Sequence, residues 1–125
     1  AIEVEGAGTS AWHVGESPDG RSAAAARRHG VNLRGRARQF VAADFQRFDY
    51  IVAMDRANRR DLLALAPDAA AAAKVSLLRD HDQEADGPDV PDPYYGEGDG
   101  FERVFQICRA GGRGLLVAIR SQHAL

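Results

Sequence analysis

The amino-acid sequence predicts an α/β fold in which a small parallel sheet is flanked by helices. Three short segments have the composition of strands, and they alternate along the chain with three segments of helical spacing. Because strands that alternate with helices usually pair in parallel through helical crossovers, this order favours a parallel sheet. A chain of 125 residues fits one domain with one modest core, so we assign residues 1–125 to a single domain.

The three predicted strands differ in how much surface they can bury. Residues 1–4 alternate apolar and charged side chains, which is typical of a short strand with one buried face. Residues 48–54 contain an unbroken apolar run from Tyr50 to Met54, as expected of a strand covered on both faces. Residues 74–78 are the third candidate, and they are also short.

The first two predicted helices have recognisable ends. Asp19 can cap a helix over residues 22–28, which is rich in Ala and Arg and is closed by Gly30. Leucines at helical spacing predict a second helix over residues 57–65, and Pro67 stops it.

The last third of the chain combines a long loop with a long helix. Residues 79–100 are dense in Asp, Glu, Pro and Gly, which predicts a loop. Residues 101–119 return to helical spacing, with Val104, Phe105 and Cys108 among the positions expected to face inward.

The segment Asp92–Gly96 is the strongest functional candidate in that loop. It reads Asp-Pro-Tyr-Tyr-Gly and places one carboxylate and two phenol rings on a turn. Pro93 fixes its own φ and biases Asp92 toward an extended conformation, while Gly96 frees the exit. Such a turn can hold an acid over a pocket. From the residues alone, a solvated Asp-Pro turn stays open as the alternative.

Three further strings occur in the order of one known family. They are Ala11–Gly15 (Ala-Trp-His-Val-Gly), Ala53–Asn58 (Ala-Met-Asp-Arg-Ala-Asn) and Val90–Pro91 directly before the turn. With the turn, they make the chain from about Ile2 to Leu116 resemble the low-molecular-weight protein-tyrosine phosphatase family. The resemblance implies hydrolysis of phosphotyrosine through a cysteinyl-phosphate intermediate, without a metal or other cofactor. The implied substrate is a phosphotyrosine protein or a small aryl phosphate.

The resemblance also implies roles for four residues. Asp92 matches the general acid that protonates the leaving phenolate and then activates water as a base. Tyr94 and Tyr95 match an aromatic wall that stacks on the substrate ring, and Trp12 matches the opposite lip of the pocket. Packing of these rings at the edge of the core is the alternative. We expect the four residues to converge at the carboxyl ends of the strands.

One part of the family pattern is absent from these 125 residues, namely a Cys and an Arg separated by five residues. In the family this phosphate-binding loop follows the first strand, which has an interior position in a four-stranded parallel sheet, and precedes the first helix. Residues 1–4, 48–54 and 74–78 match the second, third and fourth strands. We therefore expect an incomplete, truncated domain with a gap in its sheet and strand edges through which the chain can self-associate.

Three functional hypotheses follow from the resemblance. The leading one is a phosphatase-family chain that is inactive as written, because the nucleophile and the phosphate-clamping arginine are missing. The second is a pseudophosphatase or regulatory module that binds partners through Trp12, Tyr94, Tyr95 and an arginine-rich face. The third is an active phosphatase with a clipped N-terminus.

Cys108 does not replace the missing nucleophile. Four residues, not five, separate it from Arg113, so the arginine falls out of register with a phosphate cradle. The segment also lies where the family has its last helix. We interpret Cys108 as a structural helix residue.

Other ligand patterns in the sequence are weak. Residues 6–11 match a loose dinucleotide pattern, but Gly15 and Pro18 interrupt the helix that would have to follow. Residues 82–87 imitate the start of a calcium loop, but Pro93 stands where a bidentate Glu is needed. The histidines are scattered, with no paired spacing that would suggest zinc. The resemblance likewise implies no metal and no cofactor.

Charge and hydropathy describe an ordinary cytoplasmic protein. The net charge is −2, which implies no strong attraction to nucleic acid or to an anionic membrane. Arginines between residues 27 and 47 keep nucleic acid as a weak alternative, but no aromatic residue interleaves with them until Phe40. We expect no membrane span and no signal peptide, and the single cysteine fits a reducing compartment.

Overall fold

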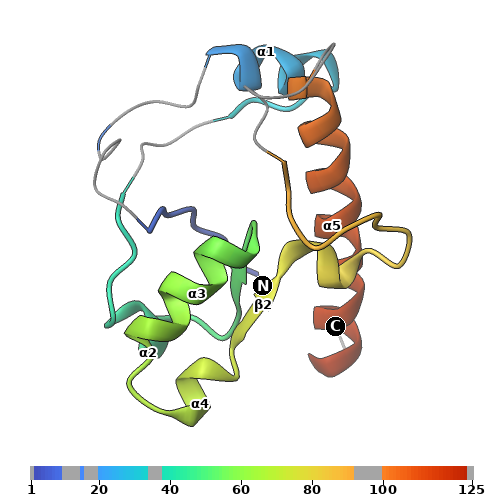
Figure 1. The fold of residues 1–125 in the computed structure, drawn as a ribbon. Coiled ribbons are helices and arrows are strands. Elements are labelled where there is room, and N and C mark those ends of the chain that lie inside the picture. The colour runs from blue at the N-terminus through green and yellow to red at the C-terminus, as the bar shows by residue number, and fades with distance from the viewer. Residues whose placement is uncertain (1, 10–14, 16–19, 34–37, 92–99, 124–125) are drawn as a thin grey trace.

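The computed structural model describes residues 2–9, 15, 20–33, 38–91 and 100–123. Figure 1 shows the long helix α5 along one side of the molecule, with α1 beside its N-terminal end and the α2, α3 and α4 helices on the other side of the strands. In chain order the elements are α1 (Gly20–Arg28), α2 (Asp44–Arg47), β1 (Ile51–Ala53), α3 (Arg56–Leu65), α4 (Ala69–Ala72), β2 (Val75–Leu77), the 3-10 helix η1 (Leu78–His81) and α5 (Gly100–His123).

The β1 and β2 strands form a parallel pair, which confirms the predicted α/β class with a small parallel sheet flanked by helices. Val52 lies opposite Ser76 in the register, and α3 and α4 provide the crossover between the two strands. Both strands are shorter than the predicted segments 48–54 and 74–78. The first is shortened because Phe48 ends α2 and Asp55 already caps α3.

A compact apolar core fills the space between the strands and the α2, α3 and α4 helices. Phe40 and Phe45 meet edge to face, with ring centroids 5.2 Å apart. The α3 helix packs against both strands and contributes Leu62. The buried members of this core are Phe40, Phe45, Ile51, Ala53, Leu62, Ala71 and Leu77.

The helices predicted from periodicity are present, with shifted ends. The α1 helix ends at Arg28 as predicted, and Gly30 follows it with a φ of +77°, the left-handed conformation that suits a glycine. The predicted cap Asp19 lies outside the described residues. The α5 helix extends four residues past the predicted end, to His123. The short α2, α4 and η1 helices were not predicted.

The prediction of a strand at residues 1–4 is wrong for the described residues. Residues 2–7 are extended but belong to no strand, and the first ladder contact is an isolated parallel bridge between Gly8 and Gln39. A strand needs a neighbour to accept its backbone hydrogen bonds, and no described strand lies beside this segment. Val4 accordingly keeps 86% of its surface exposed.

The glycine-rich part of α5 allows a close approach to η1. A Cβ added at Gly111 would lie 2.6 Å from Leu78 Cγ, and one added at Gly114 would lie 1.7 Å from the carbonyl oxygen of His81. A Cβ at Gly112 meets no atom within 4 Å. The run of glycines after Cys108 therefore serves helix packing, and Cys108 lies within α5 as predicted.

We expect Gly114→Ala to destabilise the fold by about 2 kcal/mol, since overpacking against a backbone carbonyl forces the helix to shift. Gly112→Ala is the matched control. It lies on the same helix in open space, and removing a mid-helix glycine should stabilise by up to about 1 kcal/mol. Urea denaturation followed by circular dichroism measures both. Equal stability of the two variants would contradict the packing argument.

Candidate active site

The four predicted site residues, Trp12, Asp92, Tyr94 and Tyr95, lie outside the described residues. The flanking residues are described, however, and they show where the chain enters each segment. Thr9 precedes the segment that contains Trp12, and Pro91 precedes the segment that contains the other three.

The loop that leads to residue 92 is attached at the carboxyl end of β1. The Val90 N–H donates to the carbonyl oxygen of Met54 at 2.8 Å. One residue earlier, the Asp89 carboxylate accepts a hydrogen bond from the Arg56 backbone N–H at 2.8 Å and from the Arg56 guanidinium at 3.1 Å. Arg79 donates to the carbonyl oxygen of Asp89 at 2.8 Å. These contacts fix the loop against the end of β1, the start of α3 and η1.

Asp89 is an anchor for the loop rather than an acid. Hydrogen bonds from the Arg56 side chain, followed by that from the Arg56 N–H, hold the pKa of Asp89 below its usual range. A lowered pKa favours the ionised form, so Asp89 is a poorer proton donor than an ordinary aspartate. The acid role expected of Asp92 therefore has no rival in Asp89.

The segment that leads to Trp12 reaches the same helix end. Asp55 caps α3 by accepting from the Asn58 N–H at 2.7 Å. Asn58 then donates through its side-chain amide to Thr9 Oγ1 at 3.5 Å, and Gln39 donates to the carbonyl oxygen of Thr9 at the same distance. Both routes into the predicted site thus leave from contacts with residues 54–58, at the carboxyl end of β1.

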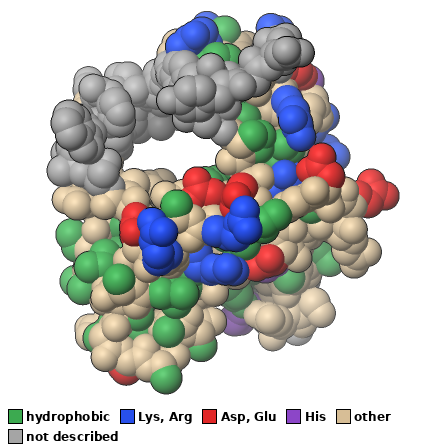
Figure 2. All heavy atoms as spheres, viewed as in Figure 1, with side chains coloured by type: hydrophobic (Ala, Val, Ile, Leu, Met, Phe, Trp, Pro, Cys, Tyr) green, Lys and Arg blue, Asp and Glu red, His purple; other side chains and the backbone are tan. Residues whose placement is uncertain are grey.

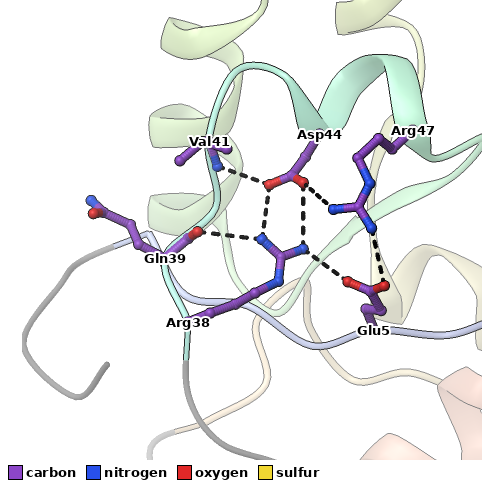
Figure 3. Close-up of polar contacts among 6 residues, drawn as sticks. All are labelled: Glu5, Arg38, Gln39, Val41, Asp44 and Arg47. Atoms are coloured by element: carbon purple, nitrogen blue, oxygen red, sulfur yellow. Dashed lines mark hydrogen bonds and ion pairs between the residues drawn. The ribbon is translucent and has the colours of Figure 1, made fainter. Parts of the chain in front are cut away.

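A buried carboxylate holds the N-terminal segment in place (Figure 3). The Asp44 side chain is 2% exposed and accepts from the Val41 N–H at 2.9 Å, from Arg38 at 3.0 Å and from Arg47 at 3.3 Å. Both arginines also donate to Glu5, at 3.3 and 3.2 Å. We call Glu5, Arg38, Asp44 and Arg47 the clamp, because these side chains join residues 2–9 to α2.

The clamp keeps Asp44 ionised despite its burial. Burial raises the pKa of Asp44, but the hydrogen bonds from Val41 N–H and Arg38, with the charges of Arg38 and Arg47, outweigh it and lower the pKa below the ordinary 3.8. The charged form is therefore the one that the folded chain stabilises.

A groove of 870 Å³ lies between residues 2–9 and the β1 strand. Helix α5 contributes Leu115, Leu116 and Ile119 to its walls, and α3 contributes Leu62. Thr9, Met54 and Asn58 also line the groove, so it reaches the end of β1 at which the candidate site is expected. A largely apolar groove that meets polar groups at the end of a strand is a common setting for a ligand site in an α/β fold.

The other sequence candidates take structural roles. Cys108 is half-buried, and burial raises the pKa of its thiol, the opposite of what a nucleophile needs. Asp86, from the calcium-like segment, pairs with Arg79 and Arg103. Within the described part of the chain, no three His, Cys, Asp or Glu side chains are grouped so that they could hold a metal ion.

The surface charges and the helices bear on the expectations about nucleic acid and about a membrane span. On the face in Figure 2, Lys and Arg side chains lie next to Asp and Glu side chains, so this face lacks the continuous basic stripe that nucleic-acid backbones bind. None of the helices in the described ranges has the length and apolar character that crossing a membrane requires.

Comparison with known proteins gives one consistent result. The family model for "Low molecular weight phosphotyrosine protein phosphatase" matches residues 1–125. The "Low molecular weight protein-tyrosine-phosphatase" of Streptomyces coelicolor is 46% identical over 123 residues, which are 97% of this chain and 75% of that protein. The Sus scrofa "Low molecular weight phosphotyrosine protein phosphatase" is 38% identical over 94% of this chain and 74% of its own length.

A solved structure supports the same relation. The crystal structure of protein tyrosine phosphatase from Entamoeba histolytica with Hepes in the active site superposes with a TM-score of 0.87 at 32% identity. The superposition covers 94% of this chain and 74% of that one.

We predict that Asp44→Asn lowers the free energy of unfolding by about 2 kcal/mol at neutral pH, which is the usual contribution of a hydrogen bond to a charged group. The folded pKa of Asp44 lies below the unfolded one, so its contribution is present above the ordinary value of 3.8 and is lost as pH falls through the folded pKa. The difference between variant and parent should therefore shrink in acid. Urea titrations at several pH values measure it.

Asp49→Asn serves as the control for that experiment. Asp49 directly follows Phe48, is exposed and lies outside the clamp. It should change stability by less than about 0.5 kcal/mol. A deficit of Asp44→Asn that stays constant down to strong acid would contradict the role given to the clamp.

Proposed function

Because the chain belongs to the low molecular weight phosphotyrosine protein phosphatase family, we propose that it supplies the acid and the aromatic walls of a site that hydrolyses phosphotyrosine. In this proposal Asp92 is the proton donor to the leaving phenolate, and Trp12, Tyr94 and Tyr95 flank the substrate ring. The substrate is a phosphotyrosine protein or a small aryl phosphate. The one free thiol fits the cytoplasm as the place of action.

One observation carries the proposal. The segments that lead to Trp12 and to Asp92 are 80 residues apart in sequence, yet both are attached to residues 54–58, through Thr9 with Asn58 and Val90 with Met54. Two segments that leave from the same sheet edge can aim side chains at a common point. This supports a shared site for the acid and the aromatic rings.

The chemistry requires a positioned acid because a phenolate is a poor leaving group, with an ordinary phenol pKa of about 10. Protonation of the bridging oxygen as the bond to phosphorus breaks avoids that anion, and the resulting carboxylate is then the base for water. Asp89 is less suited to this role, because its carboxylate accepts hydrogen bonds from Arg56 that favour the ionised form.

The same chemistry also requires a nucleophile, and the 125 residues contain no Cys followed by Arg after five residues. The remaining thiol, Cys108, has its pKa raised by burial and sits in α5. We therefore propose that this chain does not turn over substrate by itself. A second candidate function is that of a regulatory binding module that holds its partner through Trp12, Tyr94, Tyr95 and the arginine-rich face.

The sharpest test joins a family segment of strand, Cys-containing phosphate loop and first helix to the N-terminus of this chain. In that chimera we expect Asp92→Asn to lower kcat for a phosphotyrosine peptide by about 10²- to 10⁴-fold, the usual contribution of a general acid. The loss should be much smaller for a nitrophenyl phosphate, whose leaving group needs less protonation.

Two controls accompany the chimera. The chain without the added segment should hydrolyse an aryl phosphate no faster than its Cys108→Ser variant does. A burst of phenol that disappears on that substitution would contradict the proposed inactivity. An equal loss of kcat for both esters in Asp92→Asn would show that Asp92 is not the proton donor.

A further inference from the structure

Arg79 is a buried arginine that holds the loop of residues 82–91 at two points. We call these residues the approach loop, because they lead to Asp92. The Arg79 side chain is 7% exposed. It donates through Nη1 to the carbonyl oxygen of Asp89 at 2.8 Å and through Nη2 to the Asp86 carboxylate. The planar fork of a guanidinium fixes the directions of both acceptors, which the single nitrogen of a lysine cannot do.

The backbone that carries Arg79 has a fixed place in the fold. Arg79 lies in η1, which follows β2 directly. The Asp80 carboxylate accepts from the Leu77 N–H at 3.0 Å, and the carbonyl oxygen of His81 lies against Gly114 of α5. Because both ends of η1 are held in this way, the guanidinium reaches the approach loop from a fixed support.

One peptide unit of the approach loop is held from both sides. Its carbonyl, which belongs to Asp89, accepts from Arg79. Its N–H, which belongs to Val90, donates to the carbonyl oxygen of Met54 at 2.8 Å. Since a peptide unit is planar, hydrogen bonds on its two sides fix the orientation of the plane. The end of β1 therefore provides one of the two holds, and Arg79 provides the other.

The sequence that follows this peptide unit has few free torsions. It reads Val90-Pro91-Asp92-Pro93. Each proline fixes its own φ at about −65° and restricts the residue before it to extended conformations. A rotation of the held peptide plane is therefore passed on to the Asp92 carboxylate with little loss.

The burial of Arg79 is not fully compensated by the described residues. Its Nε–H has no hydrogen-bond acceptor among them. The Asp86 carboxylate that pairs with the guanidinium is itself 69% exposed. A buried cation with an unsatisfied N–H contributes little to stability, because the loss of hydration offsets much of the attraction. Placement of the approach loop explains this arginine better than stabilisation of the fold does.

We propose that Arg79 is a positioning residue for the general acid of the proposed phosphatase site. By fixing the Asp89–Val90 peptide, it aims the Asp92 carboxylate at the oxygen of the leaving group. Because Arg79 is buried, it acts through the loop and not on the substrate. This inference rests on the acid role proposed for Asp92. It predicts that loss of the fork harms the step in which a proton reaches the leaving group.

The first test uses the chain as it stands. In Arg79→Lys we expect the Val90 amide to exchange with solvent at least about tenfold faster, because its peptide unit loses one of two holds. The Ile51 amide donates to the carbonyl oxygen of Lys74 at 3.1 Å and reports on the sheet. Its exchange should change little, which verifies that the variant is folded.

Two further variants complete the exchange measurement. Arg109→Lys is the matched control, because Arg109 is exposed on α5 and donates to Gln106, not to the approach loop. Its Val90 amide should exchange as in the parent. Asp86→Ala removes one of the two acceptors of Arg79 at an exposed position, where the fold tolerates substitution. It should accelerate Val90 exchange in the same direction, but less.

The second test uses the chimera described under the proposed function. Arg79→Lys should lower kcat for the phosphotyrosine peptide at least about tenfold, since a small misplacement of a catalytic group is costly. It should change kcat for nitrophenyl phosphate by less than about threefold and KM by less than about twofold. In the Asp92→Asn background the same substitution should have no further effect, because a positioning residue acts through the group that it positions.

Two results would overturn the proposal. Unchanged Val90 exchange in both Arg79→Lys and Asp86→Ala would show that the guanidinium does not hold the peptide unit. An equal loss of kcat for both esters in Arg79→Lys, or a further loss in the Asp92→Asn background, would show that Arg79 only stabilises the fold. Failure of the proposed function is distinguishable from these results. It would appear as an equal loss for both esters in Asp92→Asn alone, whatever the exchange of Val90 shows.

Discussion

The buried carboxylate of Asp44 is the interaction on which the arrangement of the N-terminal half depends. It joins the turn at Val41 to α2 and, through Arg38 and Arg47, to Glu5 in the extended N-terminal segment. A charge with a side chain 2% exposed is tolerated only while its partners stay in place. The clamp therefore holds residues 2–9 beside α2, and these residues form one wall of the groove.

The groove and the candidate active site meet at one place. Thr9, Met54 and Asn58 line the groove and also provide the contacts from which the segments toward Trp12 and Asp92 depart. The groove therefore ends where the acid and the aromatic rings are proposed to converge.

Much of the fold was predictable because its signals are local. Leucine spacing and Pro67 predicted α3, and the apolar run ending at Met54 predicted β1. The resemblance of the Asp92–Gly96 sequence, with the other family strings, led to the correct family. The strand expected at residues 1–4 failed for the opposite reason, since a strand depends on a neighbour that local sequence cannot supply. The clamp was not predicted either, because it joins residues that are distant in sequence: Arg38 and Glu5 are 33 residues apart.

The placement of the four predicted site residues remains a prediction, whereas the separation of residues 2–5 from β1 can be measured on the chain as it stands. Nuclear Overhauser effects between the backbone protons of residues 2–5 and those of residues 51–53 test this separation most directly. In the isolated chain, our account predicts none, together with rapid solvent exchange of the Val52 amide. A continuous set of interstrand effects joining Val4 to Val52 would contradict it, because the two segments would then pair directly and close the groove.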